Sequence, residues 1–275
     1  MAYDYELVRV TVADGVAVAV VDNPPINLIT IDLYRELATF AEEVMFDGDV
    51  RVVVLRSANP DFFLAHFDVA AILRFPTDRE PALEQELNPH HAMTERFRTM
   101  PKVTICEIAG RVGGGGGELA ASCDMRFGAL GRTVLCQMEV PLGILPGGSG
   151  TQRLPDLVGR SRALEIILAG DDVDAHTLER WGWLNRALPA DELRPFVDRL
   201  AARIASFPTV ALTQAKAATL AAGADPTPGL IEEAYRFQVT MRDPLSTERM
   251  RAFLERGGQT PEGESRVGAL GGELG

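Results

Sequence analysis

The hydrophobic positions in the first part of the chain predict an alternation of strands and helices. Two short β-rich runs, Leu7 to Val12 and Val16 to Val21, flank Ala13-Asp14-Gly15, a sequence typical of a hairpin turn. Apolar residues then repeat at helical spacing from about Ile31 to Met45, and Thr30 is a suitable N-cap for that helix. Continuous apolar runs predict two further strands, at Val52 to Leu55 and at Val103 to Ile108.

The pattern becomes helical in the second half of the chain. Two strand-like pieces are predicted at Met125 to Phe127 and Thr133 to Cys136, and from Ser149 onward almost every apolar repeat has helical spacing. Earlier in the chain, Asp68 to Phe75 is predicted to be helical, whereas the segment from there to Met100 is polar and poorly periodic. The sequence therefore predicts an α/β fold with a helical appendage and no internal repeat.

Composition and charge describe an ordinary globular protein. The composition, 46% hydrophobic and 24% charged, is that of an ordinary soluble domain. The length of 275 residues suffices for one large domain or two small ones. A chain of this length buries roughly three quarters of its unfolded surface and needs no covalent or metal cross-link. The formal net charge of −12 argues against nucleic acid or an anionic membrane as a partner, because both require a basic face.

Cysteine usage and the absence of long apolar runs indicate a soluble protein of a reducing compartment. The three cysteines show no C-x-x-C spacing, so neither a disulfide framework nor a thiolate zinc site is expected. The first ten residues lack a cationic stretch followed by an apolar run, and no stretch of about 18 apolar residues could form a membrane span. We expect a cytoplasmic location and neither a membrane nor a nucleic-acid partner.

The glycine run Gly113 to Gly117 is the strongest local signal of a binding site. Glycines let backbone N–H groups approach a ligand closely, and a helix that follows directs its free N–H groups and dipole to the same point. Such a site suits a phosphate or a developing oxyanion. The run matches neither a P-loop nor a G-x-G-x-x-G motif. The alternative interpretation is a flexible linker.

Two glutamates are candidates for acid–base chemistry. Glu118 follows the glycine run and is expected in the first turn of the helix, where the dipole favours its ionised form. Glu139 lies among apolar neighbours just after a strand, an unusual position for a solvated charge. Two carboxyls that meet over one substrate can divide acid and base roles. Spacing alone does not bring them together, and either could be an ordinary surface charge.

The loop from Phe62 to Asp68 is a third candidate. Asp68 is a plausible helix N-cap, which would leave N–H groups free near Phe67. His66 could act as a general base, although a single loop histidine is more often structural. The adjacent His90 and His91 would point about 100° apart on a helix, so a solvated pair is expected there rather than a metal site.

Three stretches occur in an order that resembles the crotonase, or enoyl-CoA hydratase/isomerase, superfamily. They are Phe63 to Asp68, Gly114 to Leu119 and Glu139 to Leu154, and the last contains the specific pattern PGG-x-GTQRL. The resemblance covers about residues 5 to 255. It implies a spiral of ββα units, a helical C-terminal region that packs between subunits, a homotrimer or dimer of trimers, and an acyl-CoA thioester as substrate.

The resemblance also implies the roles of individual residues. The backbone N–H groups of Phe67 and Gly115 would hold the thioester oxygen, and Glu118 and Glu139 would flank one water. Having both glutamates favours hydration, and neither a metal nor a cofactor beyond the CoA of the substrate is implied. Further positions implied to contact the substrate are Ile26, Ala65, His66, Asp68, Gly114, Pro141 and Gly143.

This sequence departs from the family pattern in several places. His66 stands where glycine is usual and Phe67 where a smaller residue is common, so the acyl pocket is expected to be narrowed or reshaped. Ala109 stands where the family often has asparagine, and the segment from Arg74 to Arg98 is the least family-like.

We expect three parts: a spiral core over 1–195, a helical trimerisation region over 196–257 and a flexible tail over 258–275.

Hydration of a 2-enoyl-CoA is the first functional hypothesis, and others remain open. The same scaffold carries out double-bond isomerisation, or hydration followed by carbon–carbon cleavage. A non-catalytic acyl-CoA-binding protein would belong to another class, but it would have no need for two carboxylates beside the thioester. Lys216 and arginines of the C-terminal helices could bind the CoA phosphates, and no motif decides which.

Overall fold

A hairpin begins the main sheet of the computed structural model, which describes residues 3–274. Strands β1 (Val8–Ala13) and β2 (Val16–Val21) are antiparallel. Asp14 and Gly15, with φ values of 51° and 84°, form the turn between them, and two left-handed residues are what a two-residue hairpin turn needs. The hairpin predicted from the sequence is therefore confirmed.

Parallel strands extend the sheet beyond this hairpin. The strand order is β1-β2-β3-β4-β6-β9, and every pair from β2 onward is parallel. The added strands are β3 (Val52–Ser57), β4 (Val103–Ile108), β6 (Met125–Ala129) and β9 (Arg186–Leu188). A second sheet has the order β5-β7-β8, with β5 and β7 parallel and β8 antiparallel to β7. Its strands are β5 (Val112–Gly113), β7 (Val134–Cys136) and β8 (Val173–Asp174).

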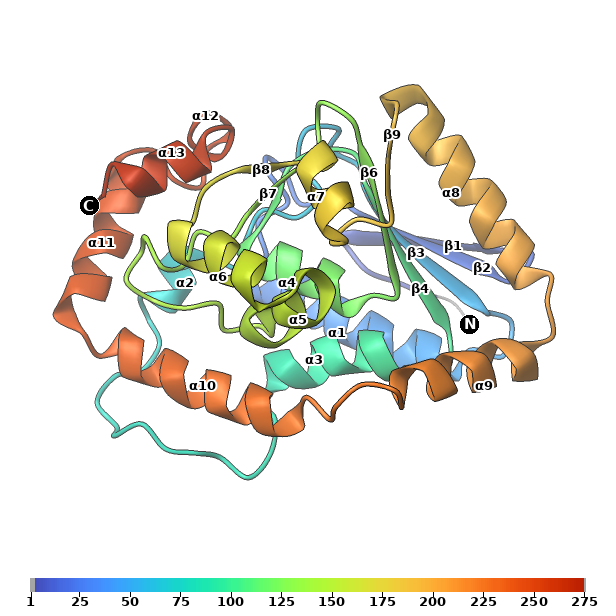
Figure 1. Ribbon diagram of the computed structural model, residues 1–275, viewed down its shortest axis with the longest axis horizontal. Coiled ribbons are helices and arrows are strands. Elements are labelled where there is room, and N and C mark those ends of the chain that lie inside the picture. The colour runs from blue at the N-terminus through green and yellow to red at the C-terminus, as the bar shows by residue number, and fades with distance from the viewer. Residues whose placement is uncertain (1–2, 275) are drawn as a thin grey trace.

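Helices cover both faces of the main sheet (Figure 1). In β3, Val53 and Leu55 belong to a core shared with the helices of one face, and Val52 and Val54 belong to a core shared with the other. This explains the continuous apolar run, because a parallel strand buried on both faces has no polar side. The first face carries α1 (Ile31–Phe46), α3 (Pro89–Thr99) and α4 (Gly114–Ser122), and the second carries α8 (Ala190–Ala205).

The remaining helices lie outside these layers. Helices α9 and α10 run along one side of the molecule in Figure 1, and α11, α12 and α13 gather at one end, near α2. Helix α10 contacts α5, and α11 contacts α2. Their bounds are α2 (Val69–Ile72), α5 (Gly150–Val158), α6 (Arg160–Ala169), α7 (Ala175–Trp181), α9 (Thr209–Leu220), α10 (Thr227–Met241), α11 (Pro244–Glu255), α12 (Pro261–Glu264) and α13 (Val267–Gly272).

The α/β fold class with a helical C-terminal region is confirmed, but two of the expected boundaries are wrong. The expected tail after Gly257 is not a flexible segment, because α12 and α13 form there and bury Val267 and Leu270 against α2 and the loop after β7. The division at residue 195 falls inside α8, which packs on the main sheet along its length. No helix in residues 3–274 combines the length and apolarity that a bilayer crossing requires.

The polar segment before Met100 also holds a helix that the periodicity did not predict. Asn88 caps α3 by accepting a hydrogen bond from the His91 N–H, and Pro89 occupies its first position. His91 is fully buried, so the expected solvated histidine pair is wrong. The sequence pattern did not reveal α3 because most of its residues are polar or charged, although one face of the helix is buried.

Candidate active site

One cavity brings the strongest candidates together. It has a volume of about 510 Å³ and a mainly apolar lining contributed by α1, α2, α3, α4, α10 and the loop after β7. His66, Phe67, Gly115, Glu118 and Glu139 all contribute to its wall. Segments separated by more than seventy residues in the sequence therefore meet at one site.

The glycine run is a helix rather than a linker. Helix α4 begins at Gly114, directly after β5, and its glycines pack too closely for side chains. A Cβ on Gly116 would lie 2.4 Å from the Leu64 carbonyl oxygen, and one on Gly117 would lie 2.8 Å from Gln137 Oε1. Because the helix starts within the glycines, Glu118 occupies its second turn and not the first turn expected from the sequence.

Two free backbone donors lie close together at the start of α4. A Cβ on Gly115 would lie 3.5 Å from the Phe67 nitrogen, so the two residues are neighbours. Within residues 3–274, neither the Phe67 nor the Gly115 N–H donates to a protein acceptor. Gly115 is the second residue of the helix, where N–H groups have no intrahelical partner. Two convergent free donors at a helix N-terminus can bind an oxygen that gains negative charge.

Glu118 is buried and held by the turn before α5. Its Oε1 accepts hydrogen bonds from the N–H groups of Gly148 and Gly150, at 2.9 and 2.7 Å. Burial is the main cause that raises the pKa of Glu118 well above its usual range, and the negative charges of Glu139 and Glu233 add to it. The two N–H donors oppose this shift without cancelling it. The ionised form is thus disfavoured, in contrast to the expectation from the helix dipole.

Glu139 has a different environment. Burial raises its pKa to about 7, while its own backbone N–H and the positive charge of His66 oppose the rise. Gln137 Nε2 donates to Glu139 Oε2 at 3.3 Å. Burial thus raises the pKa of both carboxyls, and that of Glu139 lies near neutral pH, which suits proton transfer to and from a substrate.

His90, which the sequence analysis expected in a solvated pair, lines the cavity. Its ring stacks on Tyr34 at 5.7 Å and meets the Phe67 ring edge-on at 6.0 Å. A Cβ on Gly148 would lie 2.5 Å from both His90 Nε2 and Glu118 Oε2, so these two atoms border the same space. Burial, with a further contribution from His91, lowers the pKa of His90 to about 4. The imidazole is neutral at pH 7, so it can donate a hydrogen bond to Glu118 or a bound molecule, or accept one from either.

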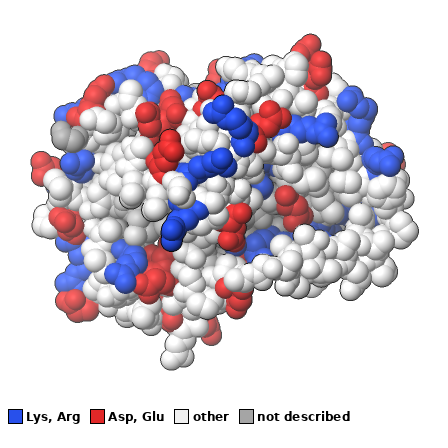
Figure 2. All heavy atoms as spheres, viewed as in Figure 1, with Lys and Arg blue, Asp and Glu red and all other residues white. Residues whose placement is uncertain are grey.

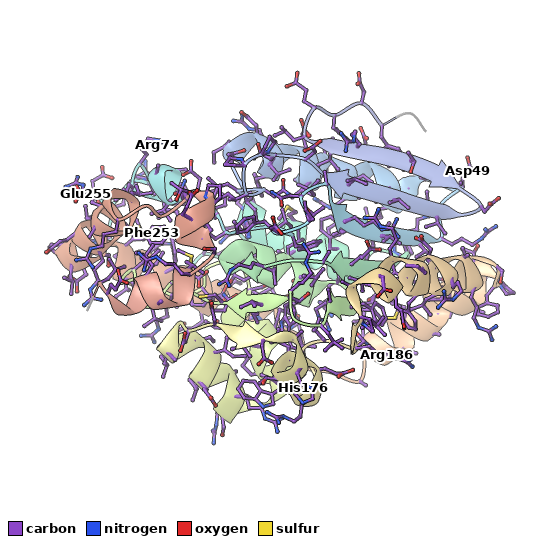
Figure 3. All side chains as sticks on the ribbon, turned by 90° about the horizontal axis from the view of Figure 1, so that it is seen from above. Asp49, Arg74, His176, Arg186, Phe253 and Glu255 are labelled. Atoms are coloured by element: carbon purple, nitrogen blue, oxygen red, sulfur yellow. The ribbon has the colours of Figure 1, made fainter. Side chains whose placement is uncertain are left out.

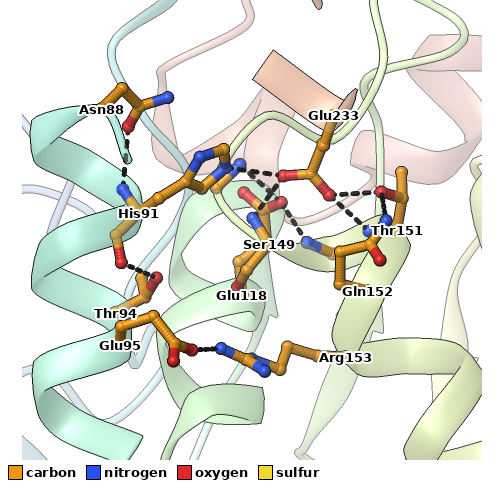
Figure 4. A network of polar contacts seen from close by, with 12 residues as sticks. Asn88, His91, Thr94, Glu95, Glu118, Ser149, Thr151, Gln152, Arg153 and Glu233 are labelled. Atoms are coloured by element: carbon orange, nitrogen blue, oxygen red, sulfur yellow. Dashed lines mark hydrogen bonds and ion pairs between the residues drawn. The ribbon is translucent and has the colours of Figure 1, made fainter. Parts of the chain in front are cut away.

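Glu233 of α10 contacts the turn that precedes α5, next to Glu118 (Figure 4). Its carboxylate accepts hydrogen bonds from the N–H groups of Ser149 and Thr151, at 2.6 and 2.9 Å, and from the Thr151 hydroxyl. His91 Nε2 lies 2.9 Å from the same carboxylate. These contacts fix the turn that binds Glu118. No local pattern in the sequence marks Glu233, because its partners lie more than eighty residues earlier in the chain.

The other substrate contacts implied by the resemblance do not line the cavity. Ile26 and Ala65 form a small apolar cluster beside it, and Asp68 caps α2 by accepting from the Ala70 N–H at 2.9 Å. Gly114 lies next to the cavity, since a Cβ there would be 2.8 Å from Glu139 Oε1. Two further positions have structural contacts: Pro141 packs against Gly170, and the Gly143 carbonyl accepts from the Ser246 hydroxyl at 2.6 Å.

The structure also bears on the candidate CoA-phosphate ligand and on metal binding. Lys216, a candidate for the CoA phosphates, is paired with Asp124 at 2.9 Å and donates to the Lys102 carbonyl at 2.8 Å. Within the described part of the chain, no group of three or more His, Cys, Asp or Glu side chains is arranged to hold a metal ion.

A mixed α/β core with a helical C-terminal region is the architecture of the crotonase fold, and here it brings two free N–H donors and two buried glutamates to one cavity. The chain belongs to the enoyl-CoA hydratase/isomerase family, whose model matches residues 11–262. It is 31% identical over 84% of its length, and 87% of the relative, to YngF of Bacillus subtilis, which carries a provisional enoyl-CoA hydratase/isomerase name.

Solved structures and a longer relative agree with this assignment. A structure from Streptomyces avermitilis with a provisional enoyl-CoA hydratase title superimposes with a TM-score of 0.89 at 40% identity, covering 98% of this chain and 99% of that one. The glyoxysomal fatty acid β-oxidation multifunctional protein MFP-a of Brassica napus is 34% identical over 70% of this chain. The match spans only 26% of MFP-a, so this chain corresponds to about a quarter of that protein.

Proposed function

We propose that this protein is an enoyl-CoA hydratase that adds water syn across the α,β double bond of a 2-enoyl-CoA thioester. The observation that carries the proposal is the meeting of Glu118 and Glu139 in one cavity with the free N–H groups of Phe67 and Gly115. The family binds acyl-CoA thioesters. Within the family, a pair of carboxyls beside the thioester is what the addition of water calls for.

The two N–H donors act on the thioester carbonyl. As water adds to C3, negative charge moves onto the thioester oxygen, and the N–H groups of Phe67 and Gly115 stabilise that enolate. A preorganised donor of this kind is worth about 3 kcal/mol of the barrier. The apolar wall of the cavity excludes bulk water and strengthens these interactions.

The two carboxyls divide the proton transfers. One takes a proton from the water whose hydroxyl bonds to C3, and the other supplies the proton that reaches C2, so that one water is consumed and no electron is transferred to a cofactor. The raised pKa values of Glu118 and Glu139 allow the pair to hold a proton at neutral pH. Because they are coupled, the two steps of their titration belong to the pair and not to one residue.

Product analysis separates this proposal from its neighbours. After incubation with a 2-enoyl-CoA, a hydratase yields a 3-hydroxyacyl-CoA heavier by one water, an isomerase yields a product of unchanged mass, and a hydratase/lyase yields a shortened thioester. We expect the hydrated product. Tight binding of the thioester without any product would instead indicate an acyl-CoA-binding protein and overturn the proposal.

We also propose that the reaction needs no cofactor besides the CoA of the substrate, and that the protein works in the cytoplasm as a homotrimer or dimer of trimers. Helix α9 supports an assembly, since none of its residues is buried in the single chain and Val210 is 73% exposed. An apolar side chain so exposed on a lone helix is suited to contact with another subunit.

A further inference from the structure

The segment after α11 contacts the loop that carries the Phe67 N–H. Gln259 accepts a hydrogen bond from the Val69 N–H at 2.9 Å through Oε1, and its Nε2 donates to Asp68 Oδ1 at 3.0 Å. Glu264 of α12 lies 3.0 Å from His66 Nε2 through its Oε1. Figure 3 places Phe253 of α11 and Arg74, just after α2, at the same end of the molecule. The C-terminal segment thus contacts the loop through three side-chain hydrogen bonds.

The contacts of His66 require a charged imidazole. Its Nδ1 lies 2.8 Å from the Phe67 carbonyl oxygen, and its Nε2 faces the Glu264 carboxylate. Both partners only accept hydrogen bonds, so both ring nitrogens must carry protons. Burial alone would lower the pKa of His66, but the charge and hydrogen bond of Glu264 outweigh it and raise the pKa. Glu264 in turn has its pKa lowered by His66 despite burial.

This buried charge lies beside a proposed acid–base group. A Cβ on Gly114 would lie 2.8 Å from His66 Cβ and equally far from Glu139 Oε1, so His66 and Glu139 flank the same glycine. The charged groups that act on the pair are Glu139 from the loop after β7 and Arg111 from the loop after β4. The imidazolium therefore favours the ionised form of Glu139.

We propose that Glu264 is a positioning residue for the hydration reaction, acting through His66. Together with the hydrogen bond from the Ile29 N–H to the His66 carbonyl oxygen at 2.9 Å, Glu264 fixes the 66–67 backbone and with it the direction of the Phe67 N–H. Glu264 also keeps a positive charge next to Glu139. The inference rests on the proposed function, because it assigns Phe67 and Glu139 their roles in hydration.

Glu264→Gln and Glu262→Gln form a matched pair of variants. Both make the same change within α12, but Glu264 is 3% exposed and Glu262 lies on the surface. We expect Glu264→Gln to lower kcat for a 2-enoyl-CoA about tenfold with little change in KM, because a misdirected donor weakens transition-state binding more than substrate binding. Glu262→Gln should match the wild type.

The pH profile distinguishes positioning from a loss of stability. Without Glu264, His66 loses its proton more readily and Glu139 loses the positive charge that lowers its pKa. The acidic limb of kcat/KM should therefore move to higher pH in Glu264→Gln, and Glu264→Asp should restore part of the shift. An unchanged limb together with wild-type kcat in a folded Glu264→Gln protein would overturn the inference.

A binding measurement separates this inference from the proposed function. The infrared band of a ¹³C-labelled thioester carbonyl in bound hexanoyl-CoA reports polarisation by the Phe67 N–H and needs no turnover. We expect a lowered frequency in the wild type and a smaller shift in Glu264→Gln. If the wild type hydrates no enoyl-CoA but this difference is present, hydration is wrong, whereas Glu264 still orients the Phe67 N–H toward a bound thioester. If the wild type hydrates and the two bands are equal, the positioning role is wrong.

Discussion

At the scale of the residue, the site contains two carboxyls that the fold holds at an energetic cost. Glu118 and Glu139 are both removed from water, and each pays desolvation for its charged form. Two backbone N–H groups compensate Glu118 in part, and His66 compensates Glu139. Burial of a carboxyl destabilises its ionised form, so it adds little to the stability of the fold. A pKa raised toward neutral pH suits proton transfer, which favours a catalytic role for the pair.

Replacing Glu118 by glutamine should change how stability depends on pH. Because its folded pKa is raised, Glu118 stabilises the folded state fully below its ordinary pKa of 4.5, and this contribution is lost as the pH rises through the folded value. Glu118→Gln keeps an oxygen for the Gly148 and Gly150 donors but does not titrate. As the pH rises above 4.5, urea unfolding should show a smaller loss of stability in the variant than in the wild type. Parallel curves for variant and wild type would contradict the raised pKa.

His90 offers a second test at this scale. His90→Phe keeps a ring between Tyr34 and Phe67 but removes the nitrogen beside Glu118 Oε2. We expect kcat/KM to fall about tenfold, which corresponds to the loss of one ordinary hydrogen bond, without loss of folding stability. His176→Phe on the surface serves as the control (Figure 3). Equal kcat/KM values for the two variants would show that His90 only fills space.

At the scale of the element, α10 holds α5 in place through one side chain. Glu233 accepts the free N–H groups at the start of α5, a site that the helix dipole also favours for a negative charge. The turn so fixed provides both donors to Glu118. The helical C-terminal region therefore belongs to the site as well as to the surface of the molecule.

Truncation of Glu233 should destabilise the protein and weaken catalysis together. Glu233→Ala leaves two N–H groups and His91 without a buried partner, so we expect a loss of about 3 kcal/mol in the free energy of unfolding. Glu232→Ala, on the exposed side of the same helix, should stay within about 0.5 kcal/mol of the wild type. Denaturant unfolding of the two variants provides the measurement. A similar small change in both would contradict the role of Glu233.

Elements with a strong local pattern could be predicted from the sequence, and others could not. The β1–β2 hairpin, the Thr30-capped helix and the buried strand β3 follow from turn residues, a cap and apolar runs. Helix α3 could not be recognised, because its buried face includes His91 and Thr94, and Met93 and Phe97 alone do not form a helical apolar repeat. The packing of α12 on the core depends on His66, nearly two hundred residues away from Glu264, and no local pattern can reveal that contact.

At the scale of the whole molecule, the site depends on topology that spacing does not contain. Glu118 and Glu139 were candidates on residue type alone, and the family resemblance paired them with Phe67 and Gly115. The fold adds what neither could supply: His90, Glu233 and Glu264 converge on them from three different helices. On the face seen in Figure 2, acidic and basic side chains are interspersed, in keeping with the absence of a basic surface expected from the charge of −12.

The most direct test of the central claim is the ultraviolet absorbance of the conjugated enoyl thioester, followed with crotonyl-CoA and with a longer 2-enoyl-CoA. The wild type should remove the chromophore from at least one substrate. Glu118→Gln and Glu139→Gln should each reduce that rate by about two orders of magnitude or more, because each loses a proton-transfer group. A chromophore that persists with both substrates despite measurable binding would contradict hydration. Wild-type rates in either variant would contradict the two-glutamate mechanism.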